Sequence, residues 1–523
     1  MTRQNNEDPA VPEDLRKEVP TRGVEPPGRG KGVPINQQAK QLALFSETAE
    51  NPVVRTVGLV DEAESHPSGP ATLAGPKSET KDENATPATM EDVASRLREA
   101  FQKVASNRGA PGPDGKSIVE VREHLDELLP ELSHRLLDGS YHPGAIRRVW
   151  IPKASGGQRG LGIPDVIDRM VQEAVRRVLE PLYEPTFHES SHGFRPGRSC
   201  HTAIAQARDH VDEGHEWVVD LDLKNFFDQV CHQRLMARLA RRVEDRRVLV
   251  LIGRWLKAEV VMPDGVQVSR DEGVPQGGPL SPLLSNIVLD ELDRELDRRG
   301  HRFVRYADDC NVYVRSERAG QRVMASLTEF IARRLRLEVN EAKSAVARTE
   351  ERHFVGFCLR REPMDGSVEV GLSKRSRERI NKRIVELTPR NWGRSLRACI
   401  SGLNEYLVGW FGFFGSCTAQ AERTFDVLDT HIRRRLRAIQ LKHWKRRRTM
   451  AHKLVQLGVS RRTAWRRLYA GRKSLWALSH DNAVDRGLRN AYFAERGLVS
   501  LAQRFRARLE QLVAPPQLTL RLG

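Results

Sequence analysis

Apolar residues recur at helical spacing once the chain passes about residue 90. The members of this series lie three or four positions apart, except for one adjacent pair, which places them on one face of an amphipathic helix. The series consists of Val93, Leu97, Ala100, Phe101 and Val104. Residues 109–115 are rich in glycine and proline, which predicts that the helix ends before them.

The rest of the pattern divides the chain into three kinds of sequence. From about 117 to 360, helical stretches alternate with short strands, and residues 375–510 predict mostly helices. Residues 1–88 show no sustained period, and we predict that they are largely disordered, since they cannot bury enough apolar surface to offset the entropy of ordering. Residues 37–45 are the exception, as a candidate short helix or docking peptide.

Charge changes the picture in the C-terminal quarter. The chain carries 86 Lys and Arg against 69 Asp and Glu, a net charge of +17. Residues 1–90 have a net charge of −4, whereas residues 391–523 hold 26 basic and 8 acidic side chains. A near-neutral body joined to a strongly basic module is typical of proteins that bind nucleic acid. A solvated charged surface is the simpler alternative.

Several classes of protein are excluded. No apolar run approaches the roughly 18 residues of a membrane span. The N-terminus lacks the apolar core of a signal peptide and is too acidic for a transit peptide. The cysteines are scattered without closely spaced pairs, which argues against disulfide frameworks and zinc-supported domains. We expect a soluble protein of the bacterial cytoplasm.

Acidic residues stand out in two apolar segments. The apolar run at 217–223 predicts a strand with Asp222 near its carboxyl end. Residues 302–314 predict a β-hairpin, because two apolar stretches flank a turn that contains Asp308 and Asp309. Aspartates that only cap a turn are the simpler explanation.

A cluster of these three carboxylates indicates metal-dependent chemistry. Like charges repel at short range unless cations bridge them. Mg²⁺ is commonly held by one or two carboxylates together with substrate phosphates. Two such ions support an in-line displacement at phosphorus. The pattern therefore favours phosphodiester synthesis.

At these residues the chain resembles the reverse transcriptases encoded by group II introns. The Tyr-Ala-Asp-Asp sequence at 306–309 looks like the signature box of that family, and residues 222–228 look like its first palm motif. Five further blocks match in the family's order, namely residues 108–115, 191–199, 273–286, 343–344 and 354–357. The resemblance covers most of the chain.

The resemblance implies a catalytic set and a metal set. The catalytic residues would be Asp222, Asp308 and Asp309. Two Mg²⁺ ions, for which Mn²⁺ would substitute, would be held by Asp222, Asp308 and the carbonyl of Leu223. Phe227 falls at the family's steric gate, which excludes a ribose 2′-hydroxyl; an ordinary core phenylalanine is the alternative.

Residues 147–164 resemble the fingers hairpin that closes on the incoming triphosphate. Lys153 and Arg159 would neutralise charge on the phosphates there. Where the family usually has Arg-Pro-Leu-Gly, this chain has Gly160 after the arginine, which puts the rigidity of the fingers in doubt.

The later blocks imply further contacts to the nucleotide and the primer. Gln276 and Gly277 would face the incoming nucleotide. Lys343 would be either a general acid toward pyrophosphate or a surface lysine. The primer grip would comprise Phe354, Val355, Gly356 and Phe357.

Residues 375 to about 505 resemble the maturase, or thumb, domain of the family. Its basic side chains would neutralise RNA phosphates, with aromatic rings available to stack on unpaired bases. The expected RNA contacts are Arg433, Arg434, Arg435, Arg437, Lys442, Lys445, Arg446, Arg447, Arg448, Arg461, Arg462, Arg466 and Arg467. Residues 454–468 read as a helix-turn-helix with Gly458 at the turn and Ser460 as N-cap; a helical pair that only packs in the thumb is the favoured alternative to DNA reading.

The expected fold class is α+β. We predict a right-hand polymerase with an antiparallel palm sheet, in which residues 89–365 form fingers and palm and residues 366–510 an all-α thumb or maturase domain. A tail at 511–523 follows. The resemblance also implies the kind of intron protein that lacks an H-N-H endonuclease, because no cysteine pairs are present.

The expected function is RNA-directed DNA polymerisation together with splicing and mobility of a group II intron by target-primed reverse transcription. The partners would be intron RNA, an RNA template with a DNA primer, dNTPs and target DNA, and no membrane. A domesticated relative in phage defence or another host task is one alternative, left open by the acidic extension. A non-catalytic RNA-binding splicing factor is another alternative. The presence of the three acidic residues argues against it.

Overall fold

The computed structural model describes residues 88–152, 157–389 and 393–513. The predicted disorder of residues 1–88 therefore lies, apart from Ala88, outside the described residues, as does most of the predicted tail. Among the residues that are described, no helix is both long and apolar enough to cross a bilayer.

The first predicted helix is present but divided in two. Thr89 caps α2 (Met90–Ser95) by accepting a hydrogen bond from the Asp92 amide at 3.2 Å. The backbone leaves the helical conformation at Arg96 (φ −95°, ψ 0°), and α3 (Leu97–Ser106) then ends before the glycine- and proline-rich stretch. The apolar series of this segment is buried as predicted.

A four-stranded antiparallel sheet lies at the centre of the region that holds the carboxylates. Its strand order is β6-β7-β3-β8, and the predicted hairpin at 302–314 is confirmed as β6 and β7. The strands are β3 (Trp217–Leu221), β6 (Arg302–Tyr306), β7 (Asp309–Val314) and β8 (Ala345–Arg348).

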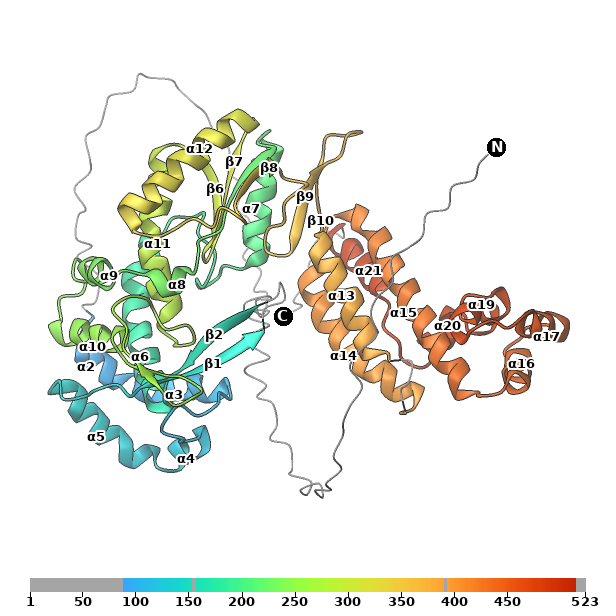
Figure 1. The fold of residues 1–523 in the computed structure, drawn as a ribbon, viewed down its shortest axis with the longest axis horizontal. Coiled ribbons are helices and arrows are strands. Elements are labelled where there is room, and N and C mark those ends of the chain that lie inside the picture. Colours follow the sequence, from blue (N-terminus) through green and yellow to red (C-terminus); the bar gives the residue numbers. More distant parts are fainter. Residues whose placement is uncertain (1–87, 153–156, 390–392, 514–523) are drawn as a thin grey trace, which may run out of the picture. The chain divides into compact units, whose positions relative to one another are not determined.

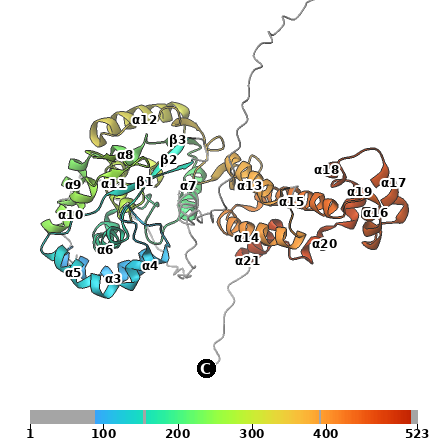
Figure 2. The same cartoon turned by 60° about the horizontal axis from the view of Figure 1, so that its bottom comes forward.

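Helices cover both faces of this sheet (Figures 1 and 2). Side chains alternate between the faces along each strand. Val218, Val304 and Tyr313 share a core with α7 (Cys200–Asp212) on one face. Val219 and Val312 share the other core with α11 (Ser281–Arg298) and α12 (Glu317–Phe330). Burial on both faces explains why β3 and β6 contain apolar residues at adjacent positions.

A second sheet has the order β2-β1-β4-β5, in which β1 and β2 form the predicted hairpin and β4 runs parallel to β1. A third, two-stranded sheet follows the central one. The strands of both are β1 (Ile146–Pro152), β2 (Gln158–Ile163), β4 (Val260–Val261), β5 (Gln267–Val268), β9 (Phe357–Arg361) and β10 (Val368–Leu372).

Helices make up the remainder. Those before the C-terminal region are α4 (Ile118–Glu123), α5 (Leu125–Leu137), α6 (Val166–Tyr183), η1 (Glu184–Thr186), α8 (Phe226–Gln229), α9 (His232–Leu239), α10 (Arg246–Leu256) and η2 (Ile331–Leu335). Those after β10 are α13 (Lys374–Leu387), α14 (Leu396–Phe414), η3 (Ala419–Ala421), α15 (Glu422–His443), α16 (Arg447–Gln456), α17 (Arg461–Tyr469), α18 (Leu475–Leu478), α19 (Asn482–Gly487), α20 (Asn490–Ala494) and α21 (Leu501–Val513). The molecule thus combines a mixed α/β region with the predicted helical C-terminal region.

Candidate active site and basic surface

Asp222 follows directly after β3, as the sequence predicts. Its amide donates to the Ser344 hydroxyl at 3.0 Å, and its carbonyl accepts from the Asn340 amide at 2.8 Å. Leu223 continues this contact through an isolated antiparallel bridge to Val339. The backbone around the carboxylate is therefore tied to the segment that leads into β8.

Asp308 and Asp309 lie where β6 turns into β7. Tyr306 pairs with Asp309, so the turn consists of Ala307 and Asp308. Ala307 has φ +57°, the positive value that tight hairpin turns require at their first position. The β3–β7 pairing ends at Leu221 opposite Cys310, so Asp222 and Asp309 each come one residue beyond the last pair. The fold thus presents the three acids at the same end of adjacent strands.

Gly193 fixes the position of this turn. A Cβ on Gly193 would overlap the backbone nitrogen of Ala307. The same loop is joined to β6 by hydrogen bonds from the His192 amide to the Arg305 carbonyl and from the Arg305 amide to the Ser190 carbonyl, each 2.8 Å long. The block at 191–199 therefore packs against the β6–β7 turn and supports it.

Arg305 is the buried support that sequence reasoning missed. It is fully buried and forms an ion pair with Asp293 of α11, which is also fully buried. All five N–H groups of its guanidinium have acceptors, which are two oxygens of Asp293, the side chains of Asn286 and Ser191, and the carbonyl of Ala307. Its position in a strand pattern gave no signal of this role, because the partners come from a helix and a distant loop.

The electrostatics of the acids favour binding of a cation. Burial raises the pKa of Asp308, and the Asp222 carboxylate adds to this effect while Arg159 opposes it. Asp309 has an exposed edge, yet withdrawal of its carboxyl from bulk water and repulsion by Asp308 raise its pKa to about 8. Groups that resist ionisation beside one another gain most from a neutralising charge.

Metal ligation itself stays a prediction. No group of three or more His, Cys, Asp or Glu side chains in the described part of the chain has the spacing of a metal site. A cation does lie beside Asp222, because the Lys343 ammonium is 3.3 Å from its Oδ2. The donor types of Asp222 and Asp308 fit Mg²⁺, which prefers carboxylate oxygens.

Lys343 is held in place through Arg352, a second residue that the sequence did not reveal. The Arg352 guanidinium donates to Asp220 Oδ2 from Nε at 2.8 Å and from Nη2 at 2.5 Å. Nη2 also donates to the Lys343 carbonyl at 2.7 Å. The structure thereby brings Lys343 to the Asp222 carboxylate, although the lysine side chain is itself exposed, so its role as a general acid stays a prediction.

The predicted nucleotide contacts are partly brought together. Arg159 donates from Nε to Gln276 Oε1 at 2.7 Å, which joins the β1–β2 hairpin to the block at 273–286. Gly277 lies so close to this hairpin that a Cβ would overlap the Gly162 carbonyl oxygen. Lys153 lies outside the described residues.

Gly160 is braced by a neighbouring strand. The Arg148 guanidinium donates to the Gly160 carbonyl at 3.0 Å, and it occupies the space where a side chain at this position would begin. The Arg148 side chain also lies over the Trp150 ring, 5.7 Å from its centroid. The glycine that departs from the family pattern is therefore packed rather than open.

Phe227 is 8% exposed and contacts Phe226 edge to face, with ring centroids 5.1 Å apart. Gly273 packs on the backbone of Phe227, and the Val274 amide donates to the Phe227 carbonyl at 2.6 Å. These contacts suit both a steric gate and a core phenylalanine, so the gate stays a prediction.

The predicted primer grip forms a tight turn. Phe354 and Phe357 exchange backbone hydrogen bonds of 3.0 and 2.9 Å. The two residues between them both have positive φ, +44° at Val355 and +91° at Gly356, as a type I′ turn requires. Phe357 is buried and stacks on Phe413 of α14 with ring centroids 5.6 Å apart.

Two of the predicted RNA contacts are wrong. Arg435 is buried and donates to the Thr388 carbonyl at 2.7 Å, where it satisfies the end of α13. Arg437 is also buried and donates to the Leu488 carbonyl at 3.0 Å, and it pairs with Asp485. Both side chains face inward, because the buried residues of α15 cover a wider arc of the helix than the predicted apolar stripe. These guanidinium groups therefore connect α15 to neighbouring parts of the helical region.

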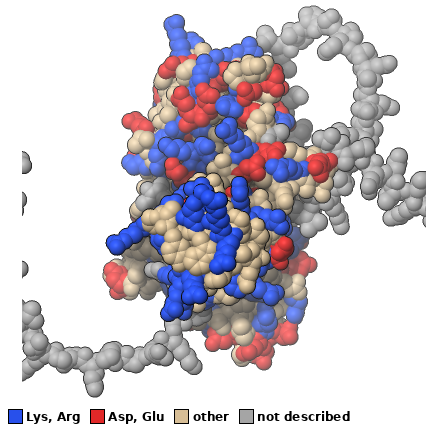
Figure 3. Space-filling model, turned by 90° about the vertical axis from the view of Figure 1, so that its right-hand side faces the viewer, with Lys and Arg blue, Asp and Glu red and all other residues tan. Residues whose placement is uncertain are grey.

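The remaining basic residues fall into two groups. Arg433, Arg434, Arg447 and Arg467 are half-buried, and Arg447 donates to the carbonyls of Leu468 and Gly471. The exposed ones are Lys442, Lys445, Arg446, Arg448, Arg461, Arg462 and Arg466. Figure 3, which views the side on which α16 and α17 lie, shows Lys and Arg gathered around an uncharged patch. The basic surface that the sequence predicts is thus present, with fewer members; its partner stays a prediction.

The helix-turn-helix pattern is confirmed as a local structure. α16 ends at Gln456, Gly458 takes φ +87°, and the Ser460 hydroxyl accepts from the Thr463 amide at 3.3 Å to begin α17. Whether the pair reads DNA or only packs in its domain stays open.

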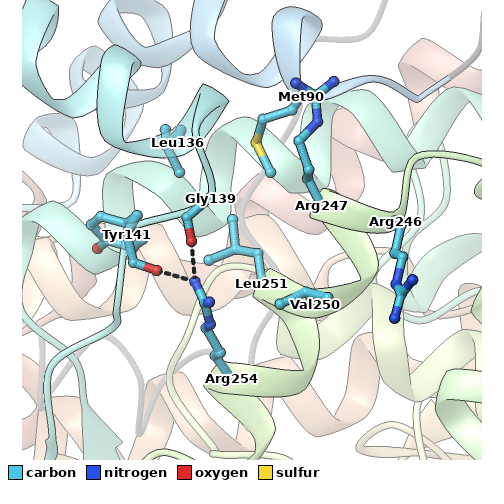
Figure 4. Close-up of a pocket in the computed structure, with 9 residues that line it drawn as sticks. All are labelled: Met90, Leu136, Gly139, Tyr141, Arg246, Arg247, Val250, Leu251 and Arg254. Atoms are coloured by element: carbon cyan, nitrogen blue, oxygen red, sulfur yellow. Dashed lines mark hydrogen bonds between the residues drawn. The ribbon is translucent and has the colours of Figure 1, made fainter.

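A cavity of about 240 Å³ lies apart from the predicted site residues, beside α10 (Figure 4). Arg254 closes one side by donating to the carbonyls of Gly139 and Tyr141 at 2.8 and 2.6 Å. The remaining lining residues are Met90, Leu136, Arg246, Arg247, Val250 and Leu251.

Comparison with known protein families agrees with this site. Residues 151–359 match the model of reverse transcriptase (RNA-dependent DNA polymerase), and residues 377–456 match the group II intron maturase-specific domain. The first match contains Asp222, Asp308 and Asp309, and the second contains all of α15.

Individual relatives also match part of the chain. The protein YkfC of Escherichia coli is 43% identical over 209 residues, which are 39% of this chain and 55% of that protein. The group II intron-encoded protein LtrA of Lactococcus lactis is 31% identical over 330 residues, which are 50% of this chain and 54% of that protein. The match therefore spans about half the length of these relatives.

Superposition on solved structures gives low scores. A partial Cas6-RT-Cas1--Cas2 complex is 22% identical, with a TM-score of 0.31 over 47% of this chain and 43% of that one. This superposition is too weak to carry an argument. The chain thus contains a reverse transcriptase domain followed by a group II intron maturase-specific domain, and it is homologous to the group II intron-encoded protein LtrA.

Proposed function

We propose that the protein is an RNA-directed DNA polymerase that also binds a group II intron RNA and promotes its splicing and mobility. The observation that carries the polymerase half is the placement of Asp222, Asp308 and Asp309 at one end of adjacent strands, with Arg305 buried beneath the turn. A binding protein gains nothing from three acids beside a polyanion. A phosphoryl-transfer enzyme uses them to hold cations.

Asp222 and Asp308 would hold two Mg²⁺ ions, with the Leu223 carbonyl as a further ligand. When bound, such ions activate the attacking oxygen and stabilise the leaving oxygen of an in-line displacement. The protein's own side chains would orient the reacting groups and neutralise their negative charge. Arg159, held by Gln276, supplies positive charge toward the triphosphate, and Lys343, held through Arg352, supplies it beside Asp222.

The maturase half rests on the match at 377–456 and on the exposed basic side chains of α15 to α17. Intron RNA, an RNA template with a DNA primer, dNTPs and target DNA are the proposed partners. Phosphate neutralisation by such a surface supplies affinity that falls with salt.

Primer extension tests the polymerase half. An RNA template annealed to a DNA primer is incubated with dNTPs and Mg²⁺, and wild type is compared with Asp308→Ala. We expect extension by wild type and none by the variant. Asp365→Ala is a matched control, because this aspartate lies in an exposed turn where it bonds Ser367. Failure of well-folded wild type on several templates would contradict the proposal and favour a splicing factor that only binds RNA.

A further inference from the structure

Two aromatic rings form a stack on α17, in which Tyr469 is exposed and Trp465 is half-buried against the core. The rings of Trp465 and Tyr469 are nearly parallel, with an interplanar angle of 7° and centroids 5.4 Å apart. His452 of α16 contacts Trp465 edge on at 5.7 Å. Tyr469 is 49% exposed, so Trp465 covers one face of its ring while much of the rest meets water.

The stack runs from the edge of the buried face of the helix, at Trp465, to its exposed face, at Tyr469. Ala464 and Leu468 are buried and define the inward face of α17. At 100° per residue, Arg461, Trp465, Tyr469, Arg462 and Arg466 occupy one continuous arc in that order, away from Ala464. Arg461 therefore flanks the two rings on one side, and Arg462 and Arg466 flank them on the other.

The surroundings are uniformly basic. Residues 445–473 contain eleven Lys and Arg and no Asp or Glu. Within the described residues, no carboxylate pairs with Arg448, Arg461, Arg462 or Arg466, all of which are exposed. The nearest acid, Asp481, is already engaged by Lys473 at 3.1 Å.

Single-stranded nucleic acid has the chemistry that fits this arrangement. Unpaired bases stack on aromatic rings, and phosphates on either side meet guanidinium groups. A duplex keeps its bases stacked on one another and offers only phosphates and groove edges. A ring pair that is already stacked also loses little side-chain freedom when a base is added.

We infer that Trp465 and Tyr469 are a stacking platform for unpaired bases of RNA or DNA, with Arg461, Arg462 and Arg466 holding the flanking phosphates. This inference rests on the proposed function only in taking nucleic acid as the partner. It goes beyond it by assigning a single-stranded ligand to the outer face of α17, where a helix-turn-helix would bind duplex.

Photo-crosslinking of the full chain tests the platform. The probes are single strands of about 12 nucleotides, a length within the site size of such surfaces. One is RNA and one is DNA, each carries one 5-iodouracil, and each is also prepared as a duplex. We expect adducts on Trp465 or Tyr469 with single strands and few with duplexes, and the stronger of the two single strands identifies the natural ligand.

Variants separate stacking from charge. With Tyr469→Leu, the probe concentration that gives half-maximal adduct on Trp465 should rise by about tenfold. This change corresponds to the loss of one stacked base. Tyr469→Phe keeps the ring and stays near wild type. Arg462→Ala lowers the salt slope of binding by about one, while Tyr469→Leu leaves that slope unchanged.

Three outcomes would overturn the platform. They are adducts confined to other peptides, equal yields with duplex, and equal binding by the Leu and Phe variants. Primer extension by the same wild-type protein is measured in parallel. Since crosslinking needs no polymerisation, a failure of either proposal is visible without the other.

Discussion

Arg352 joins two segments that meet beside Asp222. Its guanidinium bonds Asp220, two residues before Asp222 and on the same face of β3, and also bonds the carbonyl of Lys343. The Lys343 ammonium then reaches the Asp222 carboxylate. Arg352 is thus a positioning residue for the charge beside the reacting centre.

Replacing Arg352 by Gln is expected to slow primer extension by about ten- to a hundredfold, the cost of a small misplacement near the chemistry. The rate of single-nucleotide addition at saturating dNTP measures it. Asp220→Asn should have the same effect. The double variant should be no slower than either single variant, because both substitutions remove the same contact between Arg352 and Asp220.

Arg348→Gln is the matched control for this substitution. Arg348 forms an exposed pair with Glu216 at 2.9 Å on the neighbouring strand, and exposed pairs contribute little. Its rate should stay near wild type. Equal slowing by Arg348→Gln and Arg352→Gln would refute the positioning role.

Asp165 makes stability depend on pH. Burial raises the pKa of its carboxyl to about 6, while its Oδ1 accepts from the Asp114 amide at 3.1 Å. Because the folded state keeps this proton to higher pH than the unfolded chain, this residue's contribution to stability is lost as the pH rises from about 4 to about 6.

Asp165→Asn removes that titration. Between pH 4.5 and pH 7, the free energy of unfolding of the variant should rise relative to that of wild type by about 1–2 kcal/mol, since a shift of two pKa units corresponds to at most about 2.7 kcal/mol and solvent screens a half-buried carboxyl. Urea titrations at the two pH values measure it. Asp138→Asn is the control and should show almost no change between these two pH values, because hydrogen bonds from Ser140 lower the pKa of Asp138 and its titration lies below pH 4.5 in both states.

At the scale of elements, the β6–β7 turn, which carries the proposed catalytic acids, depends on a loop that precedes it by more than a hundred residues. Gly193 lies against the Ala307 nitrogen with no space for a Cβ. The loop and β6 are also hydrogen-bonded through Ser190, His192 and Arg305. Any atom added at Gly193 must therefore displace the turn that carries Asp308.

Gly193→Ala should accordingly lower primer extension by about a hundredfold or more, in line with the effect of a displacement of about 1 Å. Gly402→Ala in α14 is the control, since nothing lies within 4 Å of the added Cβ and alanine favours a helix. It should leave extension unchanged and raise the melting temperature slightly. Normal extension by Gly193→Ala would show that the turn tolerates movement.

The hairpin of β6 and β7 was predictable because local apolar runs and a turn sequence determine it. The same holds for the α16–α17 turn, where Gly458 and Ser460 have local roles. Asp293 and Arg352 were not predictable, because their partners come from other elements and sequence spacing carries no sign of the pairing. Arg435 and Arg437 were assigned wrongly, since basic residues next to a stripe look alike whether they cap a neighbouring helix or face water.

For the whole molecule, positive charge has two separate uses. Arg305, Arg435 and Arg437 are buried and bond carbonyls or carboxylates that would otherwise lack partners. The exposed arginines of α16 and α17 have no such task. Net charge alone therefore overstates the number of phosphates that this surface neutralises.

Arg435→Gln and Arg446→Gln should separate the two uses. The first should lower the free energy of unfolding by about 2–3 kcal/mol, the range for a lost hydrogen bond from a charged donor, and leave the salt slope of RNA binding unchanged. The second should change stability by less than about 0.5 kcal/mol and lower that slope by about one. Urea unfolding and binding at several salt concentrations measure both, and a reversed pattern would show that Arg435 reaches RNA.

The five hydrogen bonds of Arg305 have a consequence for how the polymerase region opens. They connect α11, the loop at 190–193 and the catalytic turn to a single guanidinium. None of these pieces can separate without leaving a charge or several polar groups unpaired in the interior. In deuterated water, the amides of His192 and Arg305 should therefore exchange together and slowly, as one cooperative unit that opens only when the whole region unfolds.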